Sequence, residues 1–164
     1  MTMRPGADFL DLAREILRRE RDRLAVLLPQ PHELLLVGGS SMAGALTKGD
    51  VDLHLRVPAW AFAPVVTALS TVHQIVHPEM WQPTLATFTV DAPLPTGIAV
   101  TPAGSTHDVR FTRSWRRLAA DPALVAAYNE MKLRHQHDPA EYERRKSAFF
   151  DRLAAADRPD ASTK

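Results

Sequence analysis

VGGSSMAGALTKGDVDLHLRV (residues 37–57) contains the clearest structural pattern in the chain. It joins an apolar run, ELLLV at 33–37, to an alternating run, VDLHLRV at 51–57, through a turn rich in glycine and serine. Both runs predict β-strands, because strands are short, rich in apolar residues and bounded by turn residues. The intervening segment SMAGALT (41–47) predicts a short helix that ends at Lys48-Gly49.

Asp50 and Asp52 give the first chemical signal. Side chains alternate across a strand, so both acids share a face with His54 and Arg56, while the apolar residues of 51–57 share the other face. Two carboxylates about 7 Å apart at their Cβ atoms can bracket one or two divalent cations. Oxygen ligands of this kind suit Mg²⁺ (or Mn²⁺), which takes only one or two carboxylates and shares its remaining positions with phosphate and water. The alternative is a polar strand face that simply meets solvent.

The Gly-Ser turn before these acids predicts a phosphate site. The free N–H groups at the start of a helix favour an anion, Gly39 lets the backbone approach closely, and the Ser40 hydroxyl adds a hydrogen bond. Ser41 and Lys48 belong to the same expected phosphate-binding segment. A phosphate site and a cation site this close together would hold a nucleoside triphosphate, with ATP as the expected nucleotide.

The remaining pattern predicts an α+β fold: a small mixed β-sheet flanked by helices, with a helical C-terminal end. Asp121-Pro122 and Asp138-Pro139 each place an N-cap acid before a proline at the first helical position. We expect one domain over residues 1–156 and a flexible tail at 157–164. The other predicted elements are helices at 7–28 and 59–72 and strands at 85–90 (LATFTV), 97–100 (GIAV) and 107–111 (HDVRF).

Composition narrows the class of protein. The 164 residues are 45% hydrophobic and 24% charged, which is an ordinary balance for a globular domain. The net charge of +1 gives no general attraction to nucleic acid or membrane, and the absence of cysteine excludes disulfides and thiolate metal sites. The acids near the N-terminus argue against a signal peptide, and no apolar run is long enough for a membrane span. We expect a cytoplasmic protein.

Gly39-Ser40, followed after nine residues by Asp50-Val51-Asp52, resembles the signature of the DNA polymerase β-like nucleotidyltransferase superfamily. HDVRFTRSWRRLAADPALVAAYNEMK, followed by AEYERRKSAFF, is similar to the GrpB family, with the pairs Tyr128/Lys132 and Tyr142/Lys146. The resemblance covers roughly residues 33–153 and implies a nucleotidyltransferase-type fold and a nucleotidyl transfer reaction. The chain departs from GrpB sequences at Gly44 and Gly49, where they often have proline, and it keeps both acids, one of which many relatives have lost.

The resemblance also implies a third carboxylate from a later strand, and Asp108 is the best candidate. On a strand, Asp108 shares a face with Arg110, so the pair would bind metal and phosphate respectively, with Asp108 as a possible base for the acceptor. If the opposite face meets the site, His107 is the polar group near the ligand instead. The alternative for Asp108 is an edge-strand acid that is simply paired with an arginine. Lys132 lies four residues from Tyr128 on one helix face, from which it would reach the triphosphate. The alternative for Lys132 is a place at the rim of an amphipathic helix.

These features predict a Mg²⁺-dependent nucleotidyltransferase that moves a nucleoside monophosphate from a nucleoside triphosphate to an acceptor hydroxyl. The acceptor is expected to be a small molecule or a protein side chain, and a long nucleic acid is least expected because the chain has no basic surplus. The alternative is a catalytically weak or inactive module of the same fold, which binds a nucleotide or another protein.

Overall fold

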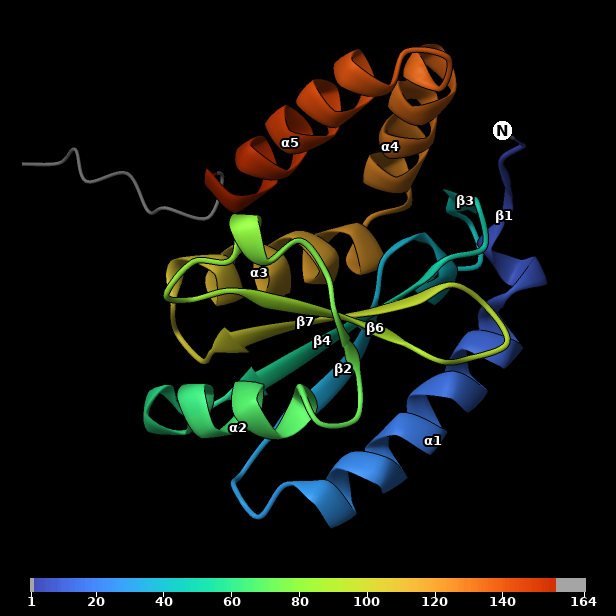
Figure 1. The fold of residues 1–164 in the computed structure, drawn as a ribbon. Helices are drawn as coiled ribbons and strands as arrows, with labels where there is room; N and C mark the ends of the chain where they lie inside the picture. Colours follow the sequence, from blue (N-terminus) through green and yellow to red (C-terminus); the bar gives the residue numbers. More distant parts are fainter. Residues whose placement is uncertain (1, 156–164) are drawn as a thin grey trace, which may run out of the picture.

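A computed structural model describes residues 2–155 as a mixed sheet with helices on both faces (Figure 1). The five strands lie in the order β2-β4-β7-β6-β5, and β4 and β7 are parallel while the other neighbours are antiparallel. A separate two-stranded pair joins β1 (Arg4–Pro5) to β3 (Leu46–Thr47). The strands of the main sheet are β2 (Glu33–Val37), β4 (Val51–Val57), β5 (Gln74–Ile75), β6 (Ala86–Val90) and β7 (Thr96–Pro102).

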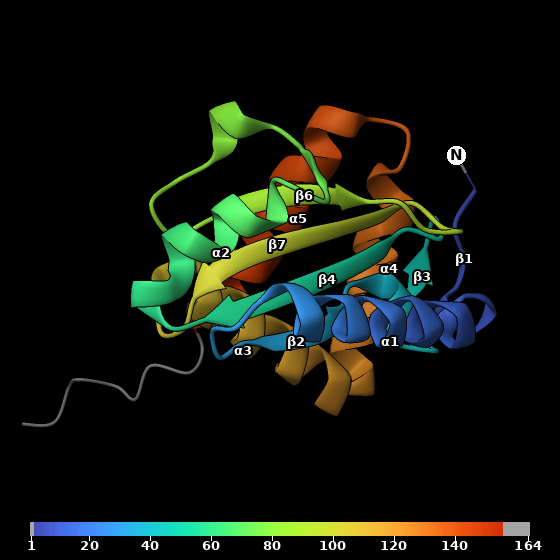
Figure 2. The same cartoon turned by 60° about the horizontal axis from the view of Figure 1, so that its bottom comes forward.

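Helices lie over both faces of the sheet, those that come earlier in the chain over one face and the C-terminal ones over the other (Figures 1 and 2). The first group packs against the apolar side of β4, and α1 runs alongside β2 (Figure 2). The second group forms the C-terminal end of the described chain. The helices are α1 (Leu10–Leu27), α2 (Phe62–Leu69), α3 (Thr106–Ala120), α4 (Pro122–His135) and α5 (Pro139–Ala155).

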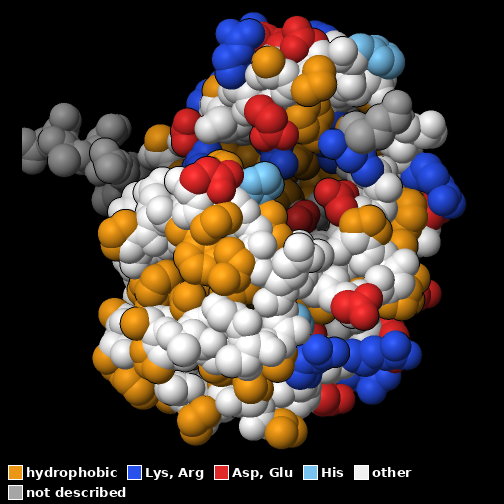
Figure 3. All heavy atoms as spheres, in the orientation of Figure 1, with side chains coloured by type: hydrophobic (Ala, Val, Ile, Leu, Met, Phe, Trp, Pro, Cys, Tyr) orange, Lys and Arg blue, Asp and Glu red, His pale blue; other side chains and the backbone are white. Residues whose placement is uncertain are grey.

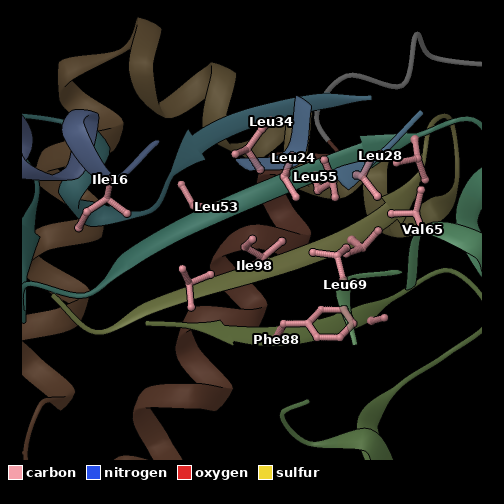
Figure 4. Close-up of a cluster of buried hydrophobic side chains, with 14 of the residues drawn as sticks. Ile16, Leu24, Leu28, Leu34, Leu53, Leu55, Val65, Leu69, Phe88 and Ile98 are labelled. Atoms are coloured by element: carbon pink, nitrogen blue, oxygen red, sulfur yellow. The ribbon is translucent and has the colours of Figure 1, made fainter. Parts of the chain in front are cut away.

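The main hydrophobic core lies between the sheet and the first two helices (Figure 4). Leu53 and Leu55 of β4 are buried there with Leu24 of α1 and Leu69 of α2. This packing follows from the alternation along β4, which puts every second side chain on the core face. The polar side chains of β4 therefore face α3 and α5.

A second, separate core joins α3, α4 and α5. Tyr128 of α4 stacks on Phe149 of α5 with ring centroids 5.2 Å apart, and Trp115 of α3 meets Phe150 at 4.9 Å. Leu118 is fully buried in the same cluster. The three C-terminal helices are thus held together chiefly by their own aromatic contacts.

The predicted α+β class and its mixed sheet are confirmed, but the predicted strand at 107–111 is wrong. These residues lie in α3, which begins after Ser105. The Ser105 hydroxyl accepts a hydrogen bond from the backbone N–H of Asp108, at 3.3 Å, and so caps the helix. Capping and the helical packing of the following residues outweigh the short alternation of HDVRF.

The predicted helix at 41–47 is also wrong. A 3-10 turn spans Gly39–Ser41, and β3 follows at Leu46–Thr47. The segment is tied to the N-terminus instead, because the carbonyls of Ala43 and Ala45 accept hydrogen bonds from the backbone N–H groups of Ala7 and Gly6 at 3.2 and 2.6 Å. The predicted helix at 59–72 is shorter in the structure, where a 3-10 turn at Ala59–Ala61 precedes α2.

The expected flexible tail at 157–164 lies outside the described residues. Within residues 2–155, none of the helices has the length and apolar character needed to cross a membrane.

Candidate functional site

The site begins where β2 ends beside β4. Val37 of β2 pairs with Asp52 of β4, so the next residue, Gly38, lies against the Asp52 side chain. Gly38 has φ 79° and ψ −177°, a combination that is essentially restricted to glycine. The turn can therefore leave β2 and pass close to the carboxylate only because it starts with this glycine.

The two serines of the turn stabilise it internally. Ser40 is fully buried and donates its hydroxyl proton to the backbone carbonyl of Asp50, at 2.5 Å. Ser41 donates to the carbonyl of Gly38 at 2.6 Å. The hydroxyls expected to contact a phosphate are thus engaged with the backbone, and the Ser40 bond holds Asp50 at the start of β4. Thr47 adds a longer contact of 3.3 Å from its hydroxyl to the Asp50 carboxylate.

Asp50 and Asp52 open into one recess of about 170 Å³ between the sheet and the C-terminal helices. Figure 3 shows a hollow there, with acidic side chains in its depth and basic ones at its edge. The sheet side supplies both acids together with Gly38 and Gly39, and the exposed Lys48 lies at the rim with its ammonium 5.3 Å from the centre of the Tyr142 ring. The helices supply Tyr128 and Lys132 from α4 and Tyr142, Glu143 and Lys146 from α5.

The acids of the recess repel each other. Asp52 is accessible to water, but only inside a hollow walled by protein atoms. This confinement, and then the neighbouring charge of Asp50, raises the pKa of Asp52 to about 6, while Lys146 acts in the opposite direction. A cation between the two carboxylates would remove the repulsion.

Lys132 brings a positive charge to the same recess from the opposite wall. Its side chain is buried, its ammonium donates to the carbonyl of Leu46 in β3, and it lies 4.1 Å from the centre of the Tyr128 ring. Burial, and then the charge of Lys146, lowers the pKa of Lys132 to about 8. Lys146 is half-buried and makes no ion pair within the described residues. Two lysines thus face two acids across one small space.

Asp108 does not join this group. It lies in the first turn of α3, fully buried, and accepts two hydrogen bonds from the Arg56 guanidinium at 2.6 and 2.9 Å. The backbone N–H of Gly104 donates a third at 2.8 Å. Burial would raise the pKa of Asp108, but these bonds outweigh it and hold the pKa below its ordinary value. The expectation that Asp108 meets the acidic pair is therefore corrected: it is the structural partner of Arg56, and His54 lies 3.6 Å from it.

Arg110 is also placed away from the recess. It pairs with Asp151 of α5 at 3.0 Å and lines a second, larger cavity of about 510 Å³. His107 lines neither cavity and contacts Thr84 at 2.6 Å instead. The two cavities share four residues, namely Asp52, Trp115, Glu143 and Lys146, so they meet at this point.

Several residues that line the recess were not among the predicted site residues, including Gly38, Glu143 and Lys146. Gly38 stands first in the quoted turn, and its proximity to Asp52 follows only from the strand register. Lys146 repeats in α5 the spacing of Tyr128 and Lys132 in α4, which was the available signal in the sequence. Glu143 carries no sequence signal of its own.

The acidic pair fits a divalent cation of the Mg²⁺ type, which needs one or two carboxylates and completes its coordination with phosphate and water. Within residues 2–155, no three His, Asp or Glu side chains come together as a ready-made metal site. Gly97 of β7 pairs with Asp52, so the neighbouring strand contributes no acid there. Any further ligands must come from the substrate, water or the helices.

Comparisons with known proteins show the fold. No protein-family model matches the chain, and no curated protein matches it by sequence. The crystal structure of the conserved protein GrpB from Enterococcus faecalis superposes with a TM-score of 0.69 and 14% identity, covering 93% of each chain. The Cid1 poly(U) polymerase with Mg and 3'-dATP bound superposes with a TM-score of 0.54 and 14% identity. That match covers 87% of this chain and 49% of Cid1, so the chain spans about half the length of the polymerase.

The predicted resemblance to GrpB is thus confirmed at the level of the fold, which the Cid1 polymerase shares.

Proposed function

From a fold that GrpB shares with a nucleotidyltransferase, we propose that this chain binds a nucleoside triphosphate and transfers its nucleoside monophosphate to an acceptor hydroxyl. One observation carries the proposal: Asp50 and Asp52 face Lys132 and Lys146 across a single recess beside a glycine turn. Opposite charges kept apart in a small space suit a ligand that brings both a cation and an anion. A magnesium-bound polyphosphate is such a ligand.

Asp50 and Asp52 would hold Mg²⁺ or Mn²⁺. When bound there, the ion supplies charge neutralisation for the phosphates in the transition state. Gly38 and Gly39 let the backbone approach the polyphosphate closely, and Lys132, Lys146 and the exposed Lys48 balance its negative charge. The volume of about 170 Å³ suits the polyphosphate rather than a whole nucleotide.

In the proposed reaction, the acceptor oxygen forms a bond to the α-phosphorus. The bond from that phosphorus to the oxygen bridging to the β-phosphate breaks, and its electron pair leaves with pyrophosphate. Glu143 lines the recess at the point where it meets the larger cavity, and in this proposal it accepts the hydroxyl proton and releases it to water. The positive charges of Lys132 and Lys146 stabilise the negative charge that develops on the leaving group.

A second function, binding of the nucleotide without transfer, is favoured by one observation. The residue beside Asp52 on the parallel strand is Gly97, so the sheet contributes two acids and no third. The chain would then bind the nucleotide without cleaving it.

Isothermal titration with MgATP, together with transfer of label from α-labelled ATP to a panel of hydroxyl compounds, tests the proposal. We expect Asp52→Asn to weaken binding of MgATP by at least about tenfold and transfer by at least about 100-fold, because a lost metal ligand forfeits several kcal/mol. Asp11→Asn is the control, since that carboxylate is fully exposed on α1. Equal transfer by Asp52→Asn and the unsubstituted protein would refute the proposal. Binding without labelled product would favour the second function.

A nucleotide screen by thermal shift, with and without Mg²⁺, tests the expected preference for ATP. A ligand that binds only the folded protein stabilises it by RT ln(1 + L/Kd), where L is the concentration of free ligand, so at equal concentration the tightest-binding nucleotide, expected to be MgATP, should raise the melting temperature most.

A further inference from the structure

The larger cavity owes its depth to small residues on two neighbouring strands. Thr87 and Thr89 of β6 pair with Ala99 and Gly97 of β7, and paired residues point to the same side of a sheet. All four line the cavity, on the face opposite to Phe88 and Ile98, which belong to the main core. Because these side chains are small, they leave an unfilled space between the sheet and the C-terminal helices.

Apolar side chains form most of the walls of this cavity. Phe111 and Trp115 of α3 and Phe150 of α5 lie over the floor, and Met80 and Leu85 close it beside β6. Its volume of about 510 Å³ falls within the range of small-molecule sites in proteins.

Several polar side chains of this cavity are bonded within the protein, whereas among the described residues the buried Nδ1 of His54 and Nε of Arg110 have no hydrogen-bond partner. The Thr87 hydroxyl donates to the carbonyl of Val76 at 2.7 Å, and the Ser147 hydroxyl lies 3.3 Å from an Arg110 nitrogen. His77 contacts Glu79 at 3.2 Å. A nucleoside carries hydrogen-bonding groups along its whole length, and a site selects such groups by pairing them. Apolar side chains dominate the walls here and only a few polar atoms are free, so the occupant is a mostly apolar body with few polar groups.

Free charge is concentrated where the cavity meets the recess of Asp50 and Asp52. Asp52, Glu143 and Lys146 line both spaces, and Trp115 lies between them. A polar group on an apolar occupant would therefore be drawn to this junction, where the polyphosphate would also end.

We infer that the larger cavity holds the acceptor of the transfer reaction, a small and mostly apolar molecule with a hydroxyl group directed at the junction beside Asp52 and Glu143. The inference rests on the proposed function, and it specifies the substrate class. The nucleoside then leaves the recess on the other side, toward the exposed Lys48 and Met3. Acceptor and nucleotide thus occupy separate spaces and bind together.

Two titrations test the assignment, with 2-naphthol as the hydroxyl-bearing apolar probe and MgATP as the nucleotide. Ala99→Leu fills the floor of the cavity without touching the acidic pair, and Thr89→Phe fills it from an exposed position. We expect each to weaken 2-naphthol binding by about tenfold or more and to leave MgATP affinity unchanged. Ala127→Leu, at an exposed position on α4, is the matched control and should change neither affinity.

Whether the two ligands bind at the same time is the decisive result. The protein saturated with MgATP should still bind 2-naphthol, because the two ligands occupy different spaces. Mutual exclusion of the two would overturn the inference, and so would unchanged 2-naphthol affinity in both filled variants or transfer of label to an oligoribonucleotide alone. Failure of the unsubstituted protein to bind MgATP would instead refute the proposed function, and only the MgATP titration reports that failure.

Discussion

Gly38 lies so close to Asp52 that no side chain fits between them: a Cβ atom at position 38 would overlap the Asp52 carboxylate. The turn that leaves β2 and the acid on β4 are therefore placed by one contact. A side chain at position 38 would therefore have to displace the Asp52 carboxylate.

Gly38→Ala should damage both stability and the site. The backbone conformation at Gly38 costs a non-glycine residue about 1–3 kcal/mol, and the new methyl group displaces Asp52. We expect a lower free energy of unfolding in urea and a loss of MgATP affinity of about tenfold or more by titration. Gly104→Ala is the control, because Gly104 also has positive φ, at 82°, but a Cβ atom there would meet nothing within 4 Å. If both variants lost MgATP affinity equally, strain alone would explain the loss.

The unpaired acid should make stability fall with rising pH. The pKa of Asp52 in the folded protein is about 6, against an ordinary value of 3.8, so the folded state holds the proton more tightly than the unfolded chain. The contribution of Asp52 to the free energy of unfolding is therefore lost as the pH rises from about 4 to about 6. His54 acts in the opposite sense: burial lowers its pKa to about 4, so its contribution is lost as the pH falls from 6.5 toward 4.

Asp52→Asn removes the first of these effects and keeps the second. Urea unfolding at pH 4.5 and pH 7.5, without divalent cations, should show a steeper loss of stability in acid for Asp52→Asn than for the unsubstituted protein. The variant should also be the more stable of the two at pH 7.5. Identical pH profiles would mean that Asp52 carries no unfavourable charge in the folded protein.

Asp108 should matter for stability and not for the nucleotide. Asp108→Asn leaves the Arg56 guanidinium without its buried carboxylate and should lower the free energy of unfolding by about 3 kcal/mol. Glu33→Gln removes the other, exposed partner of Arg56 and should cost less than about 1 kcal/mol. Below its melting temperature, Asp108→Asn should bind MgATP within about twofold of the unsubstituted protein, a factor of two being only about 0.4 kcal/mol. A tenfold loss of MgATP affinity in the folded variant would show that Asp108 contributes to the nucleotide site.

Gly97→Asp should strengthen metal binding. Gly97 pairs with Asp52, and a Cβ atom there would meet only the carbonyl of Phe88, at an ordinary 3.7 Å. A third carboxylate should raise Mn²⁺ affinity by about tenfold in a titration, since each added charged ligand tightens a site for hard cations. Gly97→Asn adds a side chain of similar size without the charge and is the matched control. Equal Mn²⁺ affinities of the two variants would show that position 97 does not face the cation.

The sheet and the acidic pair could be predicted because their signals are local. The apolar run at 33–37 and the alternation at 51–57 each define a strand, and the prolines after Asp121 and Asp138 define the starts of α4 and α5. Asp50 and Asp52 are two residues apart at the start of β4, so their side chains point to the same face of the sheet and into the same recess. Their place could be inferred without knowing the rest of the molecule.

Asp108 was misplaced because a short alternating run is ambiguous. HDVRF fits a strand, but Ser105 followed by Asp108 is also a capping-box pattern for a helix, and the structure follows the cap. Lys146 and Glu143 could not be placed from sequence, because their position depends on how α5 packs over the sheet. The packing of three aromatic helices on one another sets that position, and no local pattern encodes it.

The recess lies between two separate hydrophobic clusters, with Asp50 and Asp52 on the side of the main core and Lys132 and Lys146 on the side of the helical core. A ligand that binds residues on both sides would link the two clusters. With this link in place, the two clusters should unfold as one cooperative unit. The amide hydrogens of α4 and α5 should therefore exchange more slowly when the nucleotide is bound. The stability of the contact between the two clusters would then increase with the concentration of free nucleotide.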